Sequence, residues 1–209
     1  QMIFIPGGFS GGDEPDGSGK FITAFFRNAA IKEGVTDLLE NRDGLMCGIC
    51  NGFQALIKLG LVPYGKIIDR DENCPTLTFN TIARHQSRIV RTRISSNKSP
   101  WLALTQVGDI YSVPISHGEG RFLASDELIA KLAANGQIAT QYVDLDGNAS
   151  NDIHFNPNDS VCAIEGITSP DGRVFGKMGH SERIGKGLYK NVPGDYNIRM
   201  FEAAVKYFK

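Results

Sequence analysis

Short apolar runs alternate with segments of helical periodicity along most of the chain. Apolar runs between turn residues are typical of buried strands, and apolar residues three or four apart are typical of helices. We expect strands at residues 2–5, 45–49, 77–81, 89–94, 110–114, 138–143, 161–168 and 173–176. We expect helices at residues 21–40, 51–59, 125–134 and 197–208, and a helical turn at residues 101–104. This mixture predicts one α/β domain over residues 1–209, with a mostly parallel central sheet and an added antiparallel portion.

Local signals support several of these junctions. Ser125 is a preferred N-cap before the helix that it precedes. Asp171-Gly172, between two predicted strands, is a strong hairpin signal. Arg91 and Arg93 fall on one face of their strand, because alternate residues of a strand point the same way. Residues 6–19 are rich in Gly, Ser and Asp and predict a long loop, and loops of that length are often functional.

One junction has the pattern of a nucleophile elbow. The apolar run 45–49 leads directly into the helical segment 51–59, and Cys50 lies between Gly48 and Gly52. A sharp strand-to-helix turn exposes the turn residue and strains its backbone, and small neighbours make room for it. The helix N-terminus behind the turn favours a thiolate and provides free backbone N–H groups. The pattern therefore predicts a cysteine nucleophile at position 50.

A cysteine nucleophile needs a base and a group that orients the base. His180 and Glu182 are two residues apart just after a predicted strand, and in an extended segment such side chains point to the same side. Glu182 could then hold the imidazole of His180 toward Cys50. An imidazolium beside the thiol would lower the pKa of Cys50 from about 8.5 to about 6.5.

The third requirement is an oxyanion hole, for which the backbone N–H of Asn51 and that of Gly7 or Gly8 are candidates. Each signal alone has a plainer interpretation. A cysteine between glycines is often a packed thiol, a lone histidine is often structural, and Gly7-Gly8 alone marks a turn. Together, in this chain order, the residues form a moderately specific pattern.

Two other uses of the cysteines are weaker. Cys47 and Cys50 have the spacing of a dithiol redox motif. In that chemistry the first cysteine is exposed at a helix start, whereas Cys47 lies inside the apolar strand and is expected in the core. A zinc site would need two further ligands, and Cys74 and Cys162 show no ligand spacing, so no metal site is expected.

Two polar stretches remain open to more than one interpretation. His117, Glu119 and Arg121 stand among glycines at a strand end, either as a loop at the site or an interface, or as a solvated turn with a local ion pair. A basic stretch is either a solvated face or an interface with an acidic partner domain. Its members are Asn80, Arg84, His85, Arg88, Arg91 and Arg93. No array of stacking aromatics accompanies them, so nucleic-acid binding is not expected.

Composition excludes several classes of protein. The chain has 209 residues and a formal net charge of -1, which gives no attraction to nucleic acid or to an anionic membrane surface. No apolar run reaches the length of a membrane span, and no signal peptide opens the chain. Four cysteines without regular spacing favour a reducing, cytoplasmic compartment. Because the chain opens directly in a strand without an initiator Met, we interpret it as the C-terminal part of a longer protein.

Four short motifs stand out together: Gly7-Gly-Phe-Ser-Gly-Gly-Asp13, Cys50-Asn-Gly-Phe-Gln54, His180-Ser-Glu182 and His117-Gly-Glu-Gly-Arg121. With them the chain resembles the class I, or triad, glutamine amidotransferases, and in particular the glutaminase domain of phosphoribosylformylglycinamidine synthase. The last motif separates this family from amidotransferases that serve other acceptors. The resemblance spans nearly the whole chain and implies a flavodoxin-like, three-layer fold whose usual first strand and helix are missing here.

The resemblance also implies roles. Cys50 would attack the side-chain amide of L-glutamine and form a thioester, while His180 moves protons and Glu182 orients it. The residues that would bind glutamine and its oxyanion are Gly7, Gly8, Phe9, Asn51 and Gln54. The chain itself would need no cofactor. ATP and Mg would be handled by a separate synthetase domain or subunit, where ammonia converts formylglycinamide ribonucleotide to the amidine.

One departure concerns the histidine, which relatives often flank with prolines, whereas this chain has Gly179 and Ser181. The rigidity of the backbone around His180 is therefore in question. Two alternatives stay open beside the main hypothesis. One is a triad amidotransferase for a different acceptor, and the other is a catalytically silent scaffold that docks a synthetase.

Overall fold

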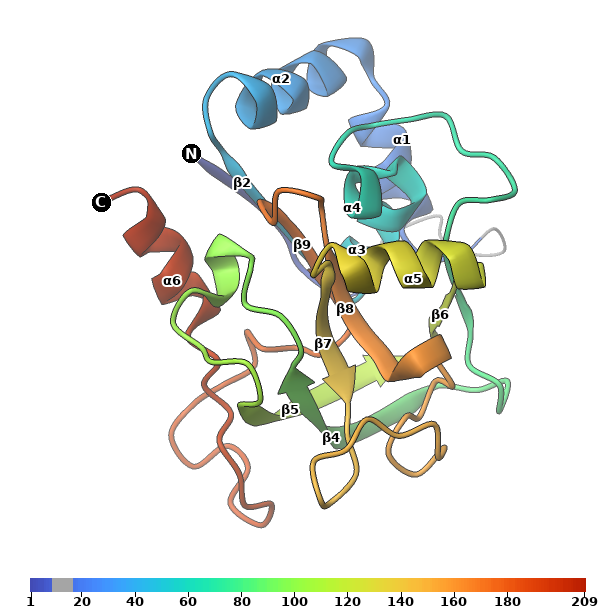
Figure 1. The fold of residues 1–209 in the computed structure, drawn as a ribbon, viewed down its shortest axis with the longest axis vertical. Coiled ribbons are helices and arrows are strands. Elements are labelled where there is room, and N and C mark those ends of the chain that lie inside the picture. The colour runs from blue at the N-terminus through green and yellow to red at the C-terminus, as the bar shows by residue number, and fades with distance from the viewer. Residues whose placement is uncertain (9–16) are drawn as a thin grey trace.

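A computed structural model describes residues 1–8 and 17–209 of the chain (Figure 1). Phe9 and the rest of the predicted loop between residues 9 and 16 lie outside the described residues. No helix in the described ranges is long and apolar enough to cross a membrane.

A seven-stranded sheet runs through the molecule in the order β1-β2-β9-β8-β7-β4-β5, and β3 and β6 pair separately. The strands are β1 (Met2–Ile5), β2 (Leu45–Ile49), β3 (Thr76–Phe79), β4 (Gln86–Ile94), β5 (Ile110–His117), β6 (Glu119–Leu123), β7 (Ile138–Tyr142), β8 (Ile164–Thr168) and β9 (Val174–Lys177). Each predicted strand thus has a counterpart, although β5 continues to His117, the first residue of the motif that was expected to follow it.

Parallel pairing is confined to β1, β2 and β9. The pairings from β9 through β8, β7 and β4 to β5 are all antiparallel. The α/β sheet with a parallel and an antiparallel portion is confirmed, but the antiparallel portion is larger than the sequence indicated. The predicted turn at Asp171-Gly172 contributes to this, because so short a connection between β8 and β9 can join only antiparallel strands.

The helices and 3-10 turns lie around this sheet (Figure 1). They are α1 (Lys20–Phe26), α2 (Ala29–Glu40), α3 (Asn51–Leu59), α4 (Leu61–Tyr64), α5 (Asp126–Ala134), α6 (Met200–Tyr207), η1 (Pro100–Leu102) and η2 (Val161–Ala163). The N-cap of α5 is Ser125, whose hydroxyl accepts from the N–H of Leu128, as its sequence position predicted. The α4 turn was not predicted, and η2 replaces the start of the strand expected from residue 161.

The single helix expected over residues 21–40 is wrong, because the chain breaks between α1 and α2. The side chain of Asn28 accepts a hydrogen bond from the N–H of Ala30 and so begins a new helix. The guanidinium of Arg27 donates to the carbonyl of Ile68, 3.1 Å away, and pairs with Asp69. The N-cap at Asn28 and the long-range contacts of Arg27 together outweigh the helical periodicity of residues 21–40.

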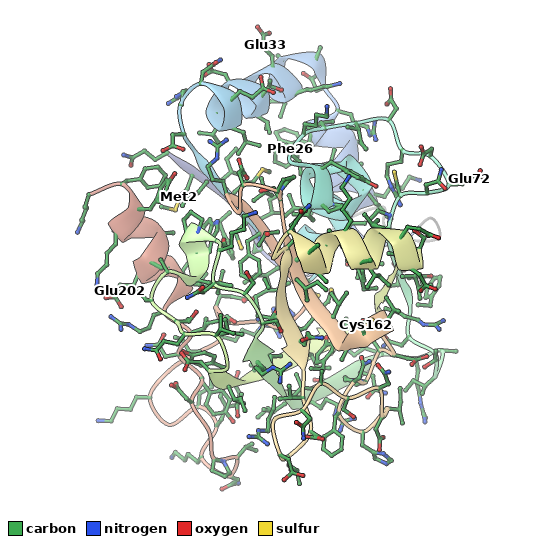
Figure 2. All side chains as sticks on the ribbon, viewed as in Figure 1. Met2, Phe26, Glu33, Glu72, Cys162 and Glu202 are labelled. Atoms are coloured by element: carbon green, nitrogen blue, oxygen red, sulfur yellow. The ribbon has the colours of Figure 1, made fainter. Side chains whose placement is uncertain are left out.

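Helices cover both faces of the parallel strands. A Cβ added to Gly52 of α3 would lie 2.2 Å from the carbonyl oxygen of Ile5, so α3 packs directly on β1. Phe4 points to the other face of β1, where its ring meets Phe201 of α6, which also contacts Trp101. Figure 2 shows side chains filling the space between these layers, with charged residues such as Glu33 at the outside.

Candidate functional site

Cys50 occupies the sharp turn that the elbow pattern predicts. It follows β2 directly and is the N-cap of α3, with φ 53° and ψ −108°. Residues other than glycine rarely adopt a positive φ, so the backbone here is strained. A Cβ on Gly48 would come within 2.6 Å of the backbone of Gly52, and a Cβ on Gly52 would come within 2.2 Å of the carbonyl oxygen of Ile5, so both flanking glycines are needed.

The expected exposure of the turn residue is wrong, because Cys50 lies in a closed environment with only 6% of the residue exposed. The thiol lies 3.6 Å from the carbonyl oxygen of Ser116, to which it donates. Burial raises the pKa of Cys50 to about 11, although hydrogen bonds from the backbone N–H groups of Asn51 and Gly8 and the charge of Arg183 favour the thiolate. The prediction of a lowered thiol pKa is therefore wrong for this arrangement, because desolvation outweighs the favourable contacts.

His180 and Glu182 form the hydrogen-bonded pair that their spacing suggested. The distance between His180 Nδ1 and Glu182 Oε1 is 2.6 Å, and His180 is 1% exposed. The pair forms across a turn, not along the extended segment assumed from the sequence, because the N–H of Arg183 donates to the carbonyl of His180. Burial opposes charge on Glu182, but hydrogen bonds from His180 and from its own backbone, with the nearby positive charges, hold the pKa of Glu182 below its usual range.

Gly7 lies between the thiol residue and the imidazole. A Cβ on Gly7 would be 2.4 Å from His180 Cε1 and 3.0 Å from Cys50 Cβ. Only a residue without a side chain can therefore stand at this position, where the chain leaves β1. The Nε2 atom of His180 is buried and makes no hydrogen bond within the described part of the chain. That nitrogen is available for the proton of a nucleophile or a leaving group.

The two glutamine-binding candidates of α3 also lie at this site. Asn51 follows Cys50 directly, and Gln54 lies one helical turn further on and is 3% exposed. The Nε2 of Gln54 donates to the carbonyl of Glu119 at 2.7 Å, which ties α3 to β6. This bond brings the wall formed by the His117–Arg121 motif against the elbow.

The His117–Arg121 motif is divided by the fold. His117 ends β5, Glu119 begins β6, and both are buried, so the interpretation as a solvated turn is wrong. Arg121 points elsewhere and pairs with Asp159, with 3.3 Å between the guanidinium and the carboxylate. The carboxylate of Glu119 accepts from the backbone N–H of Ser18, where the chain returns from the long loop. The motif thus builds the site wall with two of its three polar residues.

The tautomer of His117 follows from its partner Asn80. The Asn80 amide nitrogen donates to the carbonyls of His117 and Arg84, which leaves its Oδ1 as the acceptor for His117 Nδ1, 3.2 Å away. Burial lowers the pKa of His117 to about 4, so the ring is neutral at pH 7. His117 Nε2 is then an unprotonated acceptor, buried and without a hydrogen bond to any described residue.

A small cavity of about 50 Å³ lies beside Cys50, and His180 is not among the described residues that line it. It is lined by Gly8, Ser18, Cys50, Gln54, Ser116, His117, Gly118, Glu119 and Arg183. The sequence did not single out Ser116 or Arg183. Each directly adjoins a recognised motif, and that adjacency was the available signal.

The other candidates of the sequence lie away from this cavity. Cys47 is fully buried, as predicted, and burial raises the pKa of Cys47, so its thiol does not suit dithiol exchange. Cys162 is exposed at the molecular surface (Figure 2). In the basic stretch, Arg88 donates to the carbonyl of His154 and Arg91 to that of Leu145, so these guanidiniums hold surface loops in place.

Comparisons with known proteins agree with this geometry. The family model of the CobB/CobQ-like glutamine amidotransferase domain matches residues 1–208. A relative from Methanococcus maripaludis strain C7, named phosphoribosylformylglycinamidine synthase subunit PurQ, is 36% identical over 100% of this chain and 80% of its own length. A relative of the same name from Synechococcus elongatus is 34% identical over 93% of this chain and 75% of its own length.

A solved structure gives the same result for the fold. The structure of PurLQS from Thermotoga maritima matches with a TM-score of 0.71 and 26% identity, over 100% of this chain and 80% of that chain. The flavodoxin-like amidotransferase fold expected from the sequence is thereby confirmed. Because the family model covers nearly every residue, this chain belongs to the CobB/CobQ-like glutamine amidotransferase domain family.

Proposed function

We propose that this chain is the glutaminase component of phosphoribosylformylglycinamidine synthase and hydrolyses L-glutamine through Cys50, His180 and Glu182. One observation carries the proposal. A strained cysteine at a nucleophile elbow and a glutamate-bound histidine, far apart in sequence, lie on either side of the same glycine, Gly7. The names of the relatives support the choice of synthase.

In the first half of the reaction, the sulfur of Cys50 attacks the side-chain amide carbon of glutamine. His180 Nε2 accepts the thiol proton as the S–C bond forms, which avoids a free thiolate in a site that disfavours one. In this proposal the N–H groups of Gly8 and Asn51 stabilise the tetrahedral oxyanion, which is supported by their hydrogen bonds to the sulfur of Cys50. The C–N bond then breaks, and His180 returns the proton to the leaving nitrogen, which departs as ammonia.

In the second half, water attacks the γ-glutamyl thioester. His180 takes a proton from the water, the S–C bond breaks, and the proton passes to the sulfur as glutamate leaves. Glu182, kept ionised by its hydrogen bonds, stabilises the imidazolium in both halves. The three side chains therefore complete the hydrolysis without any metal or cofactor in this chain.

Glutamine recognition is assigned to the walls of the cavity. The bare Nε2 of His117 is an acceptor suited to an N–H donor of glutamine, and Gln54 shapes the opposite wall. Phe9, which the resemblance also suggests, lies outside the described residues. A cavity of about 50 Å³ has room for one or two water molecules but not for glutamine, so the site must open before it binds substrate.

We propose that a synthetase subunit provides this opening and uses the ammonia. In this scheme ATP and Mg are bound by the synthetase, which activates formylglycinamide ribonucleotide so that ammonia can replace its amide oxygen. The name of the similar solved structure, PurLQS, supports a multi-subunit assembly. The reaction would take place in the cytoplasm, and the isolated chain should hydrolyse glutamine weakly or not at all.

The test is the variant Cys50→Ala in the complex with the synthetase. Glutamine-dependent formation of the amidine should fall to background, because no nucleophile remains, while ammonia-dependent formation should persist. Cys47→Ser is the matched control, since it changes a buried thiol away from the cavity, and glutamine-dependent turnover should remain.

Three results would overturn the proposal. Glutamine-dependent turnover in Cys50→Ala would show that Cys50 is not the nucleophile. Glutamine hydrolysis by the wild-type complex without any amidine from formylglycinamide ribonucleotide would favour a triad amidotransferase for another acceptor. A wild-type complex that releases no ammonia from glutamine would favour the silent scaffold.

A further inference from the structure

A fully buried ion pair lies beside the catalytic histidine. Lys177 at the end of β9 and Glu165 in β8 are both 0% exposed, and 3.2 Å separates Lys177 Nζ from Glu165 Oε1. Removing two charges from water is costly, and a buried pair is by itself weak evidence for stability. Neither residue belongs to the motifs that the sequence analysis singled out. Their other hydrogen bonds show which segments of the chain the pair connects.

Local strand geometry directs the side chains of Glu165 and Lys177 into the interior of the protein. Thr140 of β7 pairs with Gly166 while Gln141 pairs with Ile164, so Glu165 is the extra residue of a β-bulge. A bulge re-aims a side chain relative to the regular alternation of its strand. Gly166 pairs with Lys177 on the other side, and a Cβ on Gly166 would lie 2.9 Å from Lys177 Cβ. The absence of a side chain at Gly166 leaves room for the lysine stem.

Three further hydrogen bonds of the pair go to the two residues that flank His180, and one more comes from Thr140 of β7 to Glu165. Lys177 Nζ donates to the carbonyl of Gly179 at 3.1 Å and to Ser181 Oγ at 2.9 Å. Glu165 Oε1 accepts from the N–H of Gly179 at 2.6 Å. The pair therefore holds the backbone on the N-terminal side of the histidine and the side chain on its C-terminal side.

Lys177 also contacts the nucleophile. The N–H of Cys50 donates to the carbonyl of Lys177 at 2.9 Å, across the parallel pairing of β2 and β9. One residue thus holds the elbow through its backbone and the segment around His180 through its side chain. The N–H of His180 itself donates to the carbonyl of Pro114, which anchors the same segment to β5.

We propose that Lys177 and Glu165 are positioning residues that fix His180 relative to Cys50 for glutamine hydrolysis. The proposal rests on the glutaminase function proposed above and deepens it. Glycine at position 179 gives the backbone beside His180 conformational freedom, and the buried pair constrains this segment through its contacts with Gly179 and Ser181.

Gly179 could not be a proline in this arrangement. Its N–H is used by Glu165, and proline has no N–H to donate. A Cβ at this position would also lie 2.7 Å from Val113 Cγ2 and 2.9 Å from Glu165 Oε1. The glycine and the ion pair therefore form one unit, in which the side chain of Glu165 occupies the space that a larger residue would need.

The test compares variants in the complex with the synthetase, where the wild type hydrolyses glutamine. The variant Lys177→Met/Glu165→Gln removes both charges but keeps an amide oxygen for the N–H of Gly179. We expect kcat for glutamine hydrolysis to fall at least tenfold, since a displacement of about 1 Å can cost about 10²-fold. We expect KM for glutamine and the urea midpoint of unfolding to stay close to those of the wild type.

The matched control is Arg173→Met, which removes ion pairs with Asp171 and Asp43 just before the other end of β9. It should hydrolyse glutamine at the wild-type rate. A second readout separates positioning from general stability. The rate at which a diazoketone analogue of glutamine modifies Cys50 should acquire, in the double variant, the pH profile of His180→Ala. A purely structural role would leave that profile unchanged and would overturn the proposal, as would a kcat that falls less than tenfold.

A further variant, Ser181→Ala, tests the proposal if the double variant does not fold. It removes one contact of Lys177 and leaves both charges paired. A kcat at least threefold below the wild type with an unchanged KM would support the proposal, and a smaller fall would overturn it. A wild-type complex that does not hydrolyse glutamine would instead reject the proposed function, so the two failures are distinguishable.

Discussion

Burial of a single sulfur sets the chemistry of Cys50. The pKa of Cys50 is raised to about 11 because desolvation outweighs the backbone N–H groups that face the sulfur. In the closed site the side chain of Cys50 is therefore a protonated thiol, and the thiol proton must move to His180 as the sulfur attacks. A protonated thiol is also oxidised more slowly than a thiolate, because the reactivity of a cysteine follows its thiolate fraction.

We predict that the thiol of Cys50 in the folded chain ionises with a midpoint near 11, against about 9.0 for an unperturbed thiol. The measurement is the pH titration of thiolate ultraviolet absorbance, taken as the difference between wild type and Cys50→Ala. The same difference in the urea-unfolded chain is the control. Because the folded-state pKa is the higher one, this burial contributes stability below about pH 9.0 and loses it as the pH rises toward 11. A folded-state midpoint below pH 8 would contradict the prediction.

The elbow as an element depends on the direct contact between α3 and β1. Gly52 lies so close to Ile5 that a methyl group would overlap the β1 backbone. Gly34 in α2 is a useful contrast, because a Cβ there would meet nothing within 4 Å. The same amino acid is thus required in one helix and replaceable in another, and contact with the sheet makes the difference.

The same substitution should therefore have opposite effects in the two helices. Gly52→Ala should lower the free energy of unfolding by about 1–3 kcal/mol or more, because overpacking forces backbone shifts. Gly34→Ala should raise it by about 0.5–1 kcal/mol, because alanine is the better helix former. Urea unfolding of both variants checks the pair of predictions. A neutral Gly52→Ala would show that α3 can move away from β1 without cost.

At the scale of the whole molecule, β7, β8 and β9 are joined by polar contacts inside the core. Thr140 donates to Glu165 Oε2 at 2.5 Å, and Glu165 pairs with Lys177, so three strands share one buried network. Tyr142 is fully buried beside it, and burial, with the charge of Glu165, raises the pKa of Tyr142 well above its usual value. The network links β7, β8 and β9, and β9 pairs in parallel with β2, the strand that leads to Cys50.

This network predicts a strong dependence of stability on both charges. Lys177→Met alone should lower the free energy of unfolding by about 3–5 kcal/mol, because it leaves Glu165 buried without a counter-charge. Lys177→Met/Glu165→Gln should recover most of that loss, since no unpaired charge remains. Guanidinium or urea unfolding of the two variants measures the difference. Equal destabilisation by the single and the double variant would show that the pair is not coupled.

Much of the site was evident in the linear sequence because its geometry is local. The glycines around Cys50 encode a tight strand-to-helix turn, and the two-residue spacing of His180 and Glu182 allows their hydrogen bond. The family resemblance rests on the same short motifs. These features depend on bonds between near neighbours, so the order of residues suffices to determine them.

Tertiary structure alone decided the rest. The thiol pKa depends on how much water the folded walls exclude, and sequence pattern carries no measure of that. The break between α1 and α2 needs the carbonyl of Ile68, and the departure of Arg121 from the site needs Asp159. The pairing of Lys177 with Glu165 needs a bulge and a strand pairing. Contacts between residues far apart in the chain exist only once the sheet has formed, because the sheet itself sets which strands become neighbours.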